Sequence, residues 1–504
     1  MTPAFRRLTL LSLIITTHLY AAPATTTALA AQPDYQQGQQ WLQQRLQQRQ
    51  QQRQQQKEHG RAQNVILFLG DGMSITTLTA ARILEGQNQG LSGEEHRLYF
   101  ETFPYSALVK TYNTNQQTPD SAGTMSAITT GVKTRAGVIA IGPEQDRGIC
   151  QGAAAYHQPT LLQWAQQQGY ATGIVTTARI THATPAASYA HSPERNWEAD
   201  SDLSREARRY GCRDIAWQLI HQAYPAGLDI ALGGGKRNFS RDGERHSGNL
   251  IADWQQQFPG GQYLENRQQL MQLRADTPGP VLGLFADSHL DYHLDRSGQQ
   301  PDLAEMTRAA LAFLQQQKQH HPQRGYLLIV EGARIDHGHH AGNAKRALDE
   351  SIELARAVQL ADQLSDNNTL LLVTADHSHT LSMAGYPQRG NDILGFAANQ
   401  GLLLANDQSP YTTLGYANGP GGSANARHSE RLPGRILWHQ PEHRQTEPHS
   451  DNFQQAALAD IYAETHGADD VALHARGPGA RLFQGLLEQH EIYHRIRRAL
   501  QQEN

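Results

Sequence analysis

The chain of 504 residues is poor in several features that would mark a class of protein. Its formal net charge is −5, so it has no basic excess of the kind that nucleic-acid-binding surfaces need, and we expect no nucleic-acid partner. Beyond the N-terminus, no apolar stretch is long enough to cross a membrane as a helix. No internal repeat is visible. The length allows several domains, but one large α/β domain with an insertion fits equally well.

Cysteine is also scarce, since the chain has only Cys150 and Cys212. In an exported protein, two cysteines favour one disulfide bond over two free thiols. Such a bond would close a long loop and, in the chain-entropy model, would stabilise the fold by about 4 kcal/mol. The cysteine content is therefore typical of a periplasmic or extracellular enzyme.

The N-terminal segment has the pattern of a secretory signal peptide. Arg6 and Arg7 precede an apolar run over residues 8–15, and small residues follow as far as Ala30. The run is too short and too interrupted to span a bilayer well, although an uncleaved anchor is the alternative. We expect a signal peptide at residues 1–30 and a periplasmic or secreted protein that has no membrane attachment after cleavage.

The next segment, residues 31–60, is dominated by glutamine and arginine. Low complexity of this kind is often disordered. A solvated helix is the alternative, because neither proline nor glycine follows Gly38 until the end of the segment. We assign no chemistry to it.

Continuous apolar runs start at residue 64 and recur along the chain. Such runs suit strands that are buried on both faces of a parallel sheet. They occupy residues 64–69, 171–175, 326–330 and 369–373, with further candidates at 229–232 and 281–285. Helical patterns lie at residues 77–84, 161–168, 204–223, 306–317, 343–364 and 482–500. This alternation predicts an α/β fold with a large, mostly parallel central sheet flanked by helices.

The composition changes at residue 381, where glycine, proline, asparagine, arginine and histidine become frequent. We interpret residues 381–464 as a loop-rich insertion with short strands. The α/β catalytic core then covers residues 61–380. The chain returns to the core at residues 465–504 and ends in a helix.

A serine lies in a small polar motif, Pro119-Asp120-Ser121-Ala122-Gly123-Thr124, before a possible helix. A hydroxyl at a helix N-terminus faces unpaired backbone N–H groups and the positive end of the dipole, where an anion such as phosphate binds readily. The common alternative is that Asp120 or Ser121 only caps the helix.

Acids and histidines are concentrated at residues 331–340. Asp336 and His340 are four residues apart, so one turn of helix brings them together. Carboxylate and imidazole ligands suit zinc, and oxygen ligands alone suit Mg²⁺. The candidate zinc ligands are Asp336, His340, Asp376, His377 and His466, and the candidate magnesium ligands are Asp71, Thr184 and Glu331.

Each of these residues has an ordinary structural alternative. Asp71 is in a Gly-Asp-Gly turn, and Asp376 is able to cap a helix. His466 is one of 25 histidines in the chain, and Thr184 precedes a proline that favours extended backbone. Yet several of the acids and histidines follow predicted parallel strands, and ligands bind beyond the carboxyl ends of such strands. We therefore expect one common site.

Taken together, the motifs resemble those of the alkaline phosphatase family and occur in the family's order over residues 60–480. They are NVILFLGDGM at 64–73, PDSAGT at 119–124 with Gly131-Val132-Lys133, Val175 to Arg179 with His182-Ala183-Thr184-Pro185, Arg195-Asn196-Trp197, VEGARIDHGHH at 330–340, VTADHSH at 373–379 and Glu464 to Gly467. The resemblance implies the family's α/β fold, a crown-like insertion and a homodimer.

The resemblance also implies roles. Ser121 is the nucleophile that becomes phosphoserine, and Arg195, steered by Asp120, clamps the phosphate. One zinc is held by Asp71, Asp376, His377 and Ser121, the second zinc by Asp336, His340 and His466, and the magnesium by Asp71, Thr184 and Glu331. His182 and His337 occupy positions at which animal-type members have histidines next to the metal ligands, and Cys150 and Cys212 match a disulfide of those members. The family's calcium site expects an acid where this chain has Ala286, which puts a structural calcium ion in doubt.

The predicted activity is hydrolysis of a broad range of small phosphate monoesters, with release of inorganic phosphate. One alternative is a phosphodiesterase-like hydrolase of the same superfamily, whose members generally lack an equivalent of Arg195. A sulfatase is excluded, because neither cysteine starts the Cys-x-Pro-x-Arg motif. The other alternative is a non-catalytic metal- or phosphate-binding protein, in which we would expect a lost nucleophile or ligand.

Overall fold

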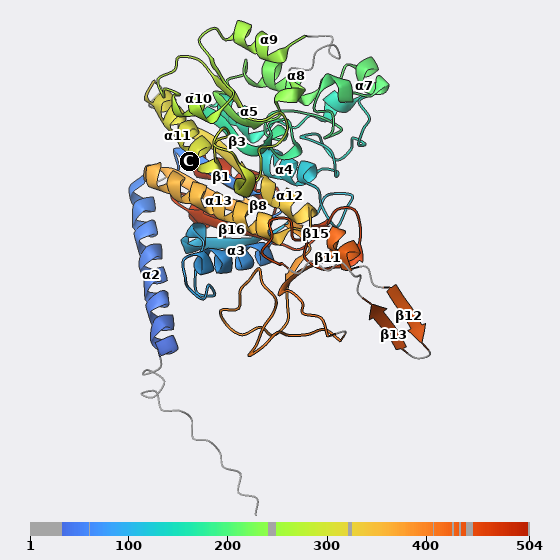
Figure 1. The fold of residues 1–504 in the computed structure, drawn as a ribbon. Helices are drawn as coiled ribbons and strands as arrows, with labels where there is room; N and C mark the ends of the chain where they lie inside the picture. Colours follow the sequence, from blue (N-terminus) through green and yellow to red (C-terminus); the bar gives the residue numbers. More distant parts are fainter. Residues whose placement is uncertain are drawn as a thin grey trace, which may run out of the picture. The chain divides into compact units, whose positions relative to one another are not determined.

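A computed structural model describes residues 33–59, 61–239, 248–320, 325–406, 408–425, 428–432, 435–439 and 447–501 (Figure 1). The predicted signal peptide lies outside these residues. Within them, no helix has the length and apolar character needed to cross a bilayer. The glutamine-rich segment forms the helix α2 (Pro33–His59), so of its two predicted alternatives the helix is the one found.

A ten-stranded sheet organises residues 64–488. Its strands are all parallel except β16, which runs antiparallel to both of its neighbours. From one edge to the other the order is β17 (Gly485–Glu488), β2 (Tyr105–Lys110), β16 (Val471–Arg476), β8 (Thr369–Ala375), β1 (Asn64–Gly70), β7 (Tyr326–Gly332), β3 (Ala171–Arg179), β4 (Ile230–Gly234), β6 (Val281–Leu284) and β5 (Gln262–Leu264). The prediction of a large, mostly parallel sheet is confirmed.

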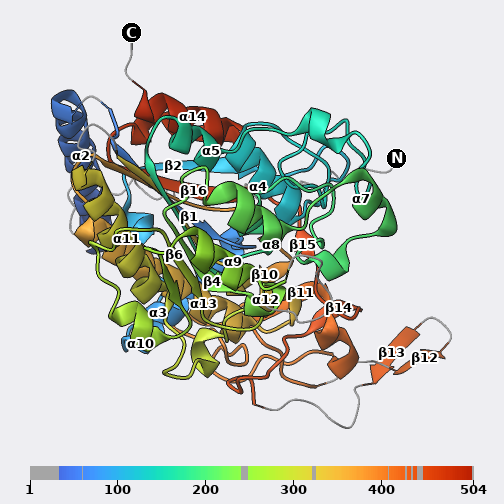
Figure 2. The same ribbon diagram turned by 90° about the horizontal axis from the view of Figure 1, so that it is seen from above.

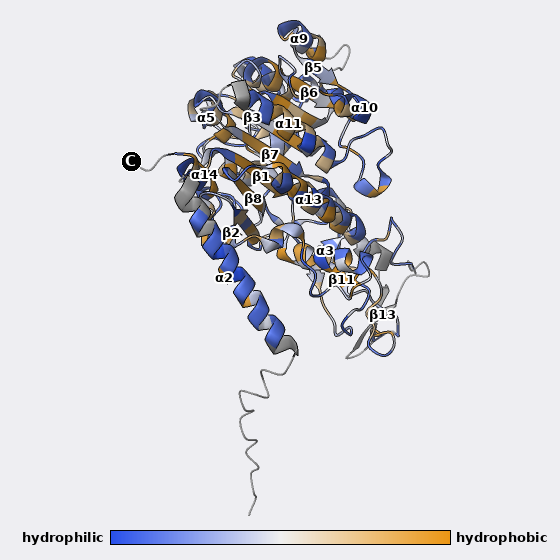
Figure 3. Cartoon of the chain, turned by 90° about the vertical axis from the view of Figure 1, so that its left-hand side faces the viewer, coloured by the Kyte–Doolittle hydropathy of each residue, from blue (hydrophilic) through white to orange (hydrophobic). Residues whose placement is uncertain are grey.

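The apolar runs form the centre of this sheet because both of its faces are covered. Every residue of β1, β7 and β8 is buried. Leu67 of β1 lies between Ile329 of β7 and Leu372 of β8. Figure 3 shows these central strands as the hydrophobic interior. Burial of this kind stabilises a fold by roughly 25 cal/mol per Å² of apolar surface removed from water.

Helices cover the two faces of the sheet, which lies between them in Figure 2. On one side α11 contacts β3, β7 and α13, and α13 contacts α3. On the other side α4 contacts α5, α6 and α14. The bounds are α3 (Ile75–Asn88), α4 (Ser121–Thr130), α5 (Leu161–Gln167), α6 (Ala183–Ala186), α7 (Arg205–Tyr210), α8 (Ile215–Gln218), α9 (Leu250–Gln257), α10 (Arg267–Met271), α11 (Leu303–His320), α12 (Arg334–His340), α13 (Ala344–Leu364) and α14 (Glu491–Leu500).

Two predicted helices are divided in the structure. The pattern at residues 204–223 is broken at Gly211, whose φ of 82° ends α7, and Asp214 then caps a new helix, α8. A φ in this range suits glycine, which has no side chain to clash with the backbone. The pattern at residues 482–500 is also broken, because β17 pairs with β2 before α14 begins.

The predicted insertion contains short strands. β10 (Leu381–Met383), β11 (Leu414–Gly419) and β14 (Ala457–Asp460) form a three-stranded sheet, and β12 (His428–Leu432) pairs with β13 (Arg435–His439). Beside them, β9 (Ser378–His379) pairs with β15 (His466–Gly467), which joins the two ends of the segment. The domain boundaries at residues 381 and 464 stay a prediction.

Candidate active site

The candidate site lies at the carboxyl ends of the central strands. Leu69 near the end of β1 is in register with Glu331 of β7 and with Thr374 of β8. The residues that follow these strands therefore emerge side by side, among them Asp71 and Asp376. The parallel register thus brings together side chains that are hundreds of residues apart in the chain.

The first group of metal-ligating side chains centres on Asp336. α12 holds Asp336 and His340 one turn apart, with 3.3 Å between the carboxylate Oδ1 and the imidazole Nε2. His466, at the start of β15, places its Nε2 3.4 Å from the same oxygen and 3.1 Å from Nε2 of His340. Ligand atoms of a tetrahedral zinc ion, with bonds of about 2.0–2.1 Å, are about 3.3 Å apart, so this spacing fits a zinc ion.

The second group consists of Asp71, Asp376 and His377, all fully buried. Nε2 of His377 is 3.4 Å from an oxygen of each carboxylate. Burial, followed by the charge of Asp376, raises the pKa of Asp71 well above its usual range. Two buried carboxylates this close to each other stay ionised only when a positive charge lies beside them.

The third group offers only oxygen atoms. Both carboxylate oxygens of Asp71, the hydroxyl of Thr184 and Oε1 of Glu331 are buried, and none has a hydrogen-bond partner among the described residues. The other oxygen of Glu331 accepts from the hydroxyl of Thr176 at 2.5 Å. Burial raises the pKa of Glu331 to about 8. Buried polar atoms are nearly always paired, so these orphaned oxygens fit a hard cation such as Mg²⁺.

Ser121 begins α4 and lies next to the second group. Its hydroxyl is buried and is 3.0 Å from Nε2 of His377. Asp120 caps the helix, because its side chain accepts a hydrogen bond from the backbone N–H of Gly123. The capping alternative thus holds for Asp120, and Ser121 is free to face the site.

Arg195 is held by Asp120 from the other side. The guanidinium donates to Oδ2 of Asp120 at 3.0 Å, and the same oxygen accepts from the backbone N–H of Gly137. Although burial alone would raise the pKa of Asp120, the charge of Arg195 and these backbone donors lower it. The carboxylate therefore stays ionised and fixes the guanidinium.

The predicted neighbours His182 and His337 lie close to the site with a third imidazole, His289, which sequence reasoning missed. The rings of His289 and His337 are 4.2 Å apart, and His182 lies within 6 Å of both, at 5.4 and 5.7 Å. Nε2 of His182 is 3.3 Å from the Arg195 guanidinium. Burial lowers the pKa of all three histidines, so they are neutral.

Two further residues were missed, His379 and Glu464. His379 lies between two carboxylates, with Nε2 2.7 Å from Asp336 and Nδ1 2.5 Å from Glu464. Although burial lowers its pKa, these carboxylates raise the pKa to about 10. The available signal was its place in the Val373–His379 motif, but only the fold shows its partners.

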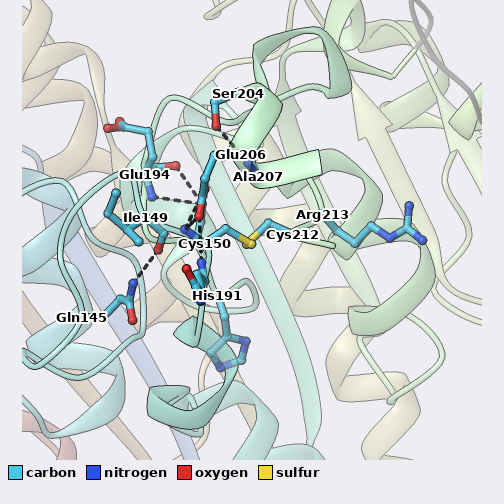
Figure 4. Close-up of a disulfide and its surroundings, with 12 residues drawn as sticks. Gln145, Ile149, Cys150, His191, Glu194, Ser204, Glu206, Ala207, Cys212 and Arg213 are labelled. Atoms are coloured by element: carbon cyan, nitrogen blue, oxygen red, sulfur yellow. Dashed lines mark hydrogen bonds between the residues drawn. A yellow bond between two sulfur atoms is a disulfide. The ribbon is translucent and has the colours of Figure 1, made fainter. Parts of the chain in front are cut away.

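The predicted disulfide between Cys150 and Cys212 is present (Figure 4). Glu206 of α7 accepts hydrogen bonds from the backbone N–H groups of Cys150 and Gln151. Cys150 packs with Trp197, two residues beyond Arg195. The disulfide thus anchors the surface segment that carries the predicted phosphate clamp.

An arrangement of a serine, an arginine and three groups of side chains suited to hold metal ions, two of them buried, is typical of a metal-dependent hydrolase of phosphate esters. A family model described as alkaline phosphatase matches residues 62–502. The chain therefore belongs to the alkaline phosphatase family, and the predicted class of metal-dependent phosphomonoester hydrolase is confirmed.

The relatives agree with this assignment. The tissue-nonspecific alkaline phosphatase of Gallus gallus is 42% identical over 454 residues, which cover 86% of this chain and 83% of that protein. An alkaline phosphatase of Gadus morhua is 40% identical over 454 residues, covering 86% of this chain and 91% of that protein.

Solved structures share the fold. The alkaline phosphatase of Thermus thermophilus superposes with a TM-score of 0.61 at 24% identity, covering 88% of this chain and 92% of that one. The alkaline phosphatase of the Antarctic bacterium TAB5 superposes with a TM-score of 0.58 at 21% identity, covering 88% of this chain and 99% of that one. At this level of identity the likeness shows the fold.

Proposed function

We propose that the protein hydrolyses phosphate monoesters through a phosphoserine intermediate on Ser121, with two zinc ions and one magnesium ion in each subunit. The observation that carries the proposal is the set of buried oxygens on Asp71, Thr184 and Glu331 that have no hydrogen-bond partner among the described residues. A histidine-to-aspartate mutant of the TAB5 enzyme is described with magnesium in its M3 site, which supports a magnesium position in this family.

Each ion has a set of residues suited to hold it. Asp336, His340 and His466 would bind one zinc, and the second group, with Ser121, would bind the other. Asp71, Thr184 and Glu331 would bind the magnesium. When bound, these ions supply positive charge that favours the serine alkoxide and the developing charge on the leaving oxygen.

The chain's own residues then carry out two displacements at phosphorus. Arg195 holds two phosphate oxygens through its planar fork and orients the ester for attack. Oγ of Ser121 forms a bond to phosphorus as the bond to the leaving oxygen breaks, so the alcohol leaves and the enzyme is phosphorylated. Water then attacks the same phosphorus, and Ser121 and inorganic phosphate are released. Because the clamp contacts only the phosphate, we expect a broad range of monoesters.

The proposal is tested by hydrolysis of a chromogenic monoester and a matched diester at alkaline pH. The protein is assayed as purified, after chelation, and after zinc and magnesium are restored separately and together. We expect strong monoester activity that is lost on chelation and returns most fully with both metals. Activity mainly on the diester would favour the phosphodiesterase alternative. No activity in the fully metallated protein would favour a non-catalytic binding protein.

We also propose that the mature enzyme is a periplasmic or secreted homodimer. The signal-peptide pattern and the disulfide support export. The dimer rests on the family resemblance. Cell fractionation and light scattering of the purified enzyme test these two points; a cytoplasmic enzyme or a monomer would contradict them.

A further inference from the structure

An ion pair fixes the segment that carries Arg195 against the end of β3. Glu198 lies three residues after Arg195, and Arg179 is the last residue of β3. The guanidinium of Arg179 donates through Nε and Nη2 to the two carboxylate oxygens of Glu198, at 2.8 and 2.5 Å. The side chains are only 14% and 12% exposed. Two parallel hydrogen bonds of this kind set both the distance and the orientation of the paired groups.

Two further donors hold the carboxylate of Glu198. The hydroxyl of Thr181, two residues after β3, donates to Oε2 at 2.6 Å. Nδ2 of Asn238 lies 3.0 Å from the same oxygen and 2.8 Å from the Thr181 hydroxyl. Both donors belong to buried residues. Glu198 is therefore held by groups from three separate parts of the chain, and such a network leaves its side chain one position.

Arg179 also contacts the histidines beside the candidate active site. Its Nη1 lies 2.5 Å from Nε2 of His289, whose ring is 4.2 Å from that of His337. The carbonyl of Arg179 accepts from the backbone N–H of His182 at 2.9 Å, and the imidazole of His182 contacts the Arg195 guanidinium. Arg179 is thus connected to Arg195 in two ways, through His182 and through Glu198.

The backbone of the same segment is anchored at both of its ends. The backbone N–H of Arg195 donates to the carbonyl of Gly137 at 2.9 Å, and the carbonyl of Glu198 accepts from the backbone N–H of Ala216 at 3.1 Å. These bonds hold the main chain in place. The ion pair adds a connection to the central sheet, because β3 is paired with β7 and β4 along its length.

On these grounds we propose that Glu198 is a positioning residue for the phosphate clamp. Paired with Arg179, it fixes the segment of Arg195 against the end of β3 and so sets the direction of the clamping guanidinium. Glu198 acts through Arg195 and not on the substrate. The inference rests on the proposed function, in which Arg195 binds the phosphate group.

Position and charge predict opposite effects when Glu198 is changed to glutamine. Glu198→Gln keeps the size of the side chain but removes a negative charge close to an anion-binding group. If only the charge mattered, phosphate would bind equally well or more tightly. If Glu198 positions Arg195, phosphate should bind more weakly, because a displaced guanidinium loses its paired hydrogen bonds to the phosphate oxygens.

The proposal is tested by binding of inorganic phosphate, so that the measurement is independent of turnover. Calorimetry on the metallated full chain gives the affinity, and mass spectrometry gives the metal content. We expect Glu198→Gln to weaken phosphate binding about tenfold with unchanged metal content. Thr181→Val removes one donor to Glu198 and should weaken binding about two- to threefold. Arg195→Ala, which removes the clamp itself, should weaken binding at least as much as Glu198→Gln.

Glu353→Gln is the matched control, because it also breaks a buried pair of glutamate and arginine. Its partner is Arg296, and no described contact joins that pair to Arg195. We expect this variant to lose stability but to bind phosphate like wild type.

A folded Glu198→Gln that binds phosphate as tightly as wild type, or more tightly, would overturn the positioning role. So would a loss of metal in that variant, or an equal loss of phosphate affinity in Glu353→Gln. If Glu198→Gln does not fold, an unchanged affinity in Thr181→Val overturns the role. Unchanged affinity in Arg195→Ala would overturn the clamp itself. A wild-type protein that shows the expected ratios but hydrolyses no ester would instead overturn the proposed function alone.

Discussion

Asp71 of the candidate metal centre and the pair formed by Arg296 and Glu353 are all buried, but only the pair supplies its own counter-charge. The guanidinium of Arg296 lies 2.5 Å from the Glu353 carboxylate, and the two side chains are 5% and 3% exposed. The backbone N–H of Leu303 donates a further hydrogen bond to the same carboxylate at 2.8 Å. This pair is complete within the chain.

At the metal centre, Asp71 lacks such partners among the described residues. Asp71 has two buried oxygens with no donor, and its nearest charged neighbours include another acid, Asp376. Such an arrangement is costly until a cation binds. The difference teaches that Glu353 is neutralised by the protein itself, whereas the carboxylate of Asp71 fits a cation that comes from outside.

The largest effect is expected when the reacting group itself is removed. Ser121→Ala should lower kcat for a monoester by at least about 10³-fold, because the proposed covalent route is lost. The other predicted metal ligands, such as Asp336 and Asp71, remain in this variant. The metal content measured by mass spectrometry should therefore stay near that of wild type. Turnover close to wild type would show that Ser121 is not the main nucleophile.

The next largest effect is expected at the complete pair. Glu353→Gln removes the carboxylate that pairs with the buried guanidinium of Arg296, and we expect a loss of about 3–5 kcal/mol in the free energy of unfolding. The loss should be the same with and without metals, because the pair does not depend on them. Denaturant unfolding of metallated and chelated protein measures it. A loss confined to one metal state would contradict the comparison.

A third kind of acid is Asp229, which is partly buried and has neither a cationic partner among the described residues nor a proposed metal. Burial raises its pKa to about 7, although the backbone N–H of Thr172 donates to it. Because the folded pKa lies above the unfolded value, this acid contributes stability at low pH that is lost as the pH rises through about 7.

We therefore expect Asp229→Asn to raise the free energy of unfolding at alkaline pH by about 2–4 kcal/mol and to have little effect near pH ~4. Thermal or denaturant unfolding across this range, with wild type at each pH, measures the difference. An effect that is the same at every pH would show that folding does not raise the pKa of Asp229.

The smallest effect, but the most diagnostic, is expected at Asp71. In chelated protein Asp71→Asn removes a buried negative charge that has no donor, and we expect a gain of about 1–2 kcal/mol in stability. With zinc and magnesium restored, the sign should reverse, because the variant has lost a shared ligand. Asp229→Asn serves as the control, whose effect should not change with metals. A gain that persists in fully metallated Asp71→Asn would contradict the assignment of Asp71 as a ligand.

Much of the fold followed from local patterns. β1, β7 and β8 were predictable because strands covered on both faces are continuously apolar. The pairing of Asp336 with His340 was predictable because a helical turn brings residues four apart together. Interruptions within helices were harder to predict from the sequence. The pattern at residues 204–223 is that of one helix, but in the structure the left-handed conformation of Gly211 divides it.

The sequence by itself determined the kinds of side chain available and the local elements that carry them: the serine at a helix start, the acids and histidines after strands, and two cysteines. Only the tertiary structure decided which of them meet. His466 contacts His340, which is 126 residues away in the sequence, and His379 contacts Glu464, which is 85 residues away. The physical reason is that local periodicity depends on neighbouring residues, whereas contacts such as these depend on the order and register of strands that the whole core selects.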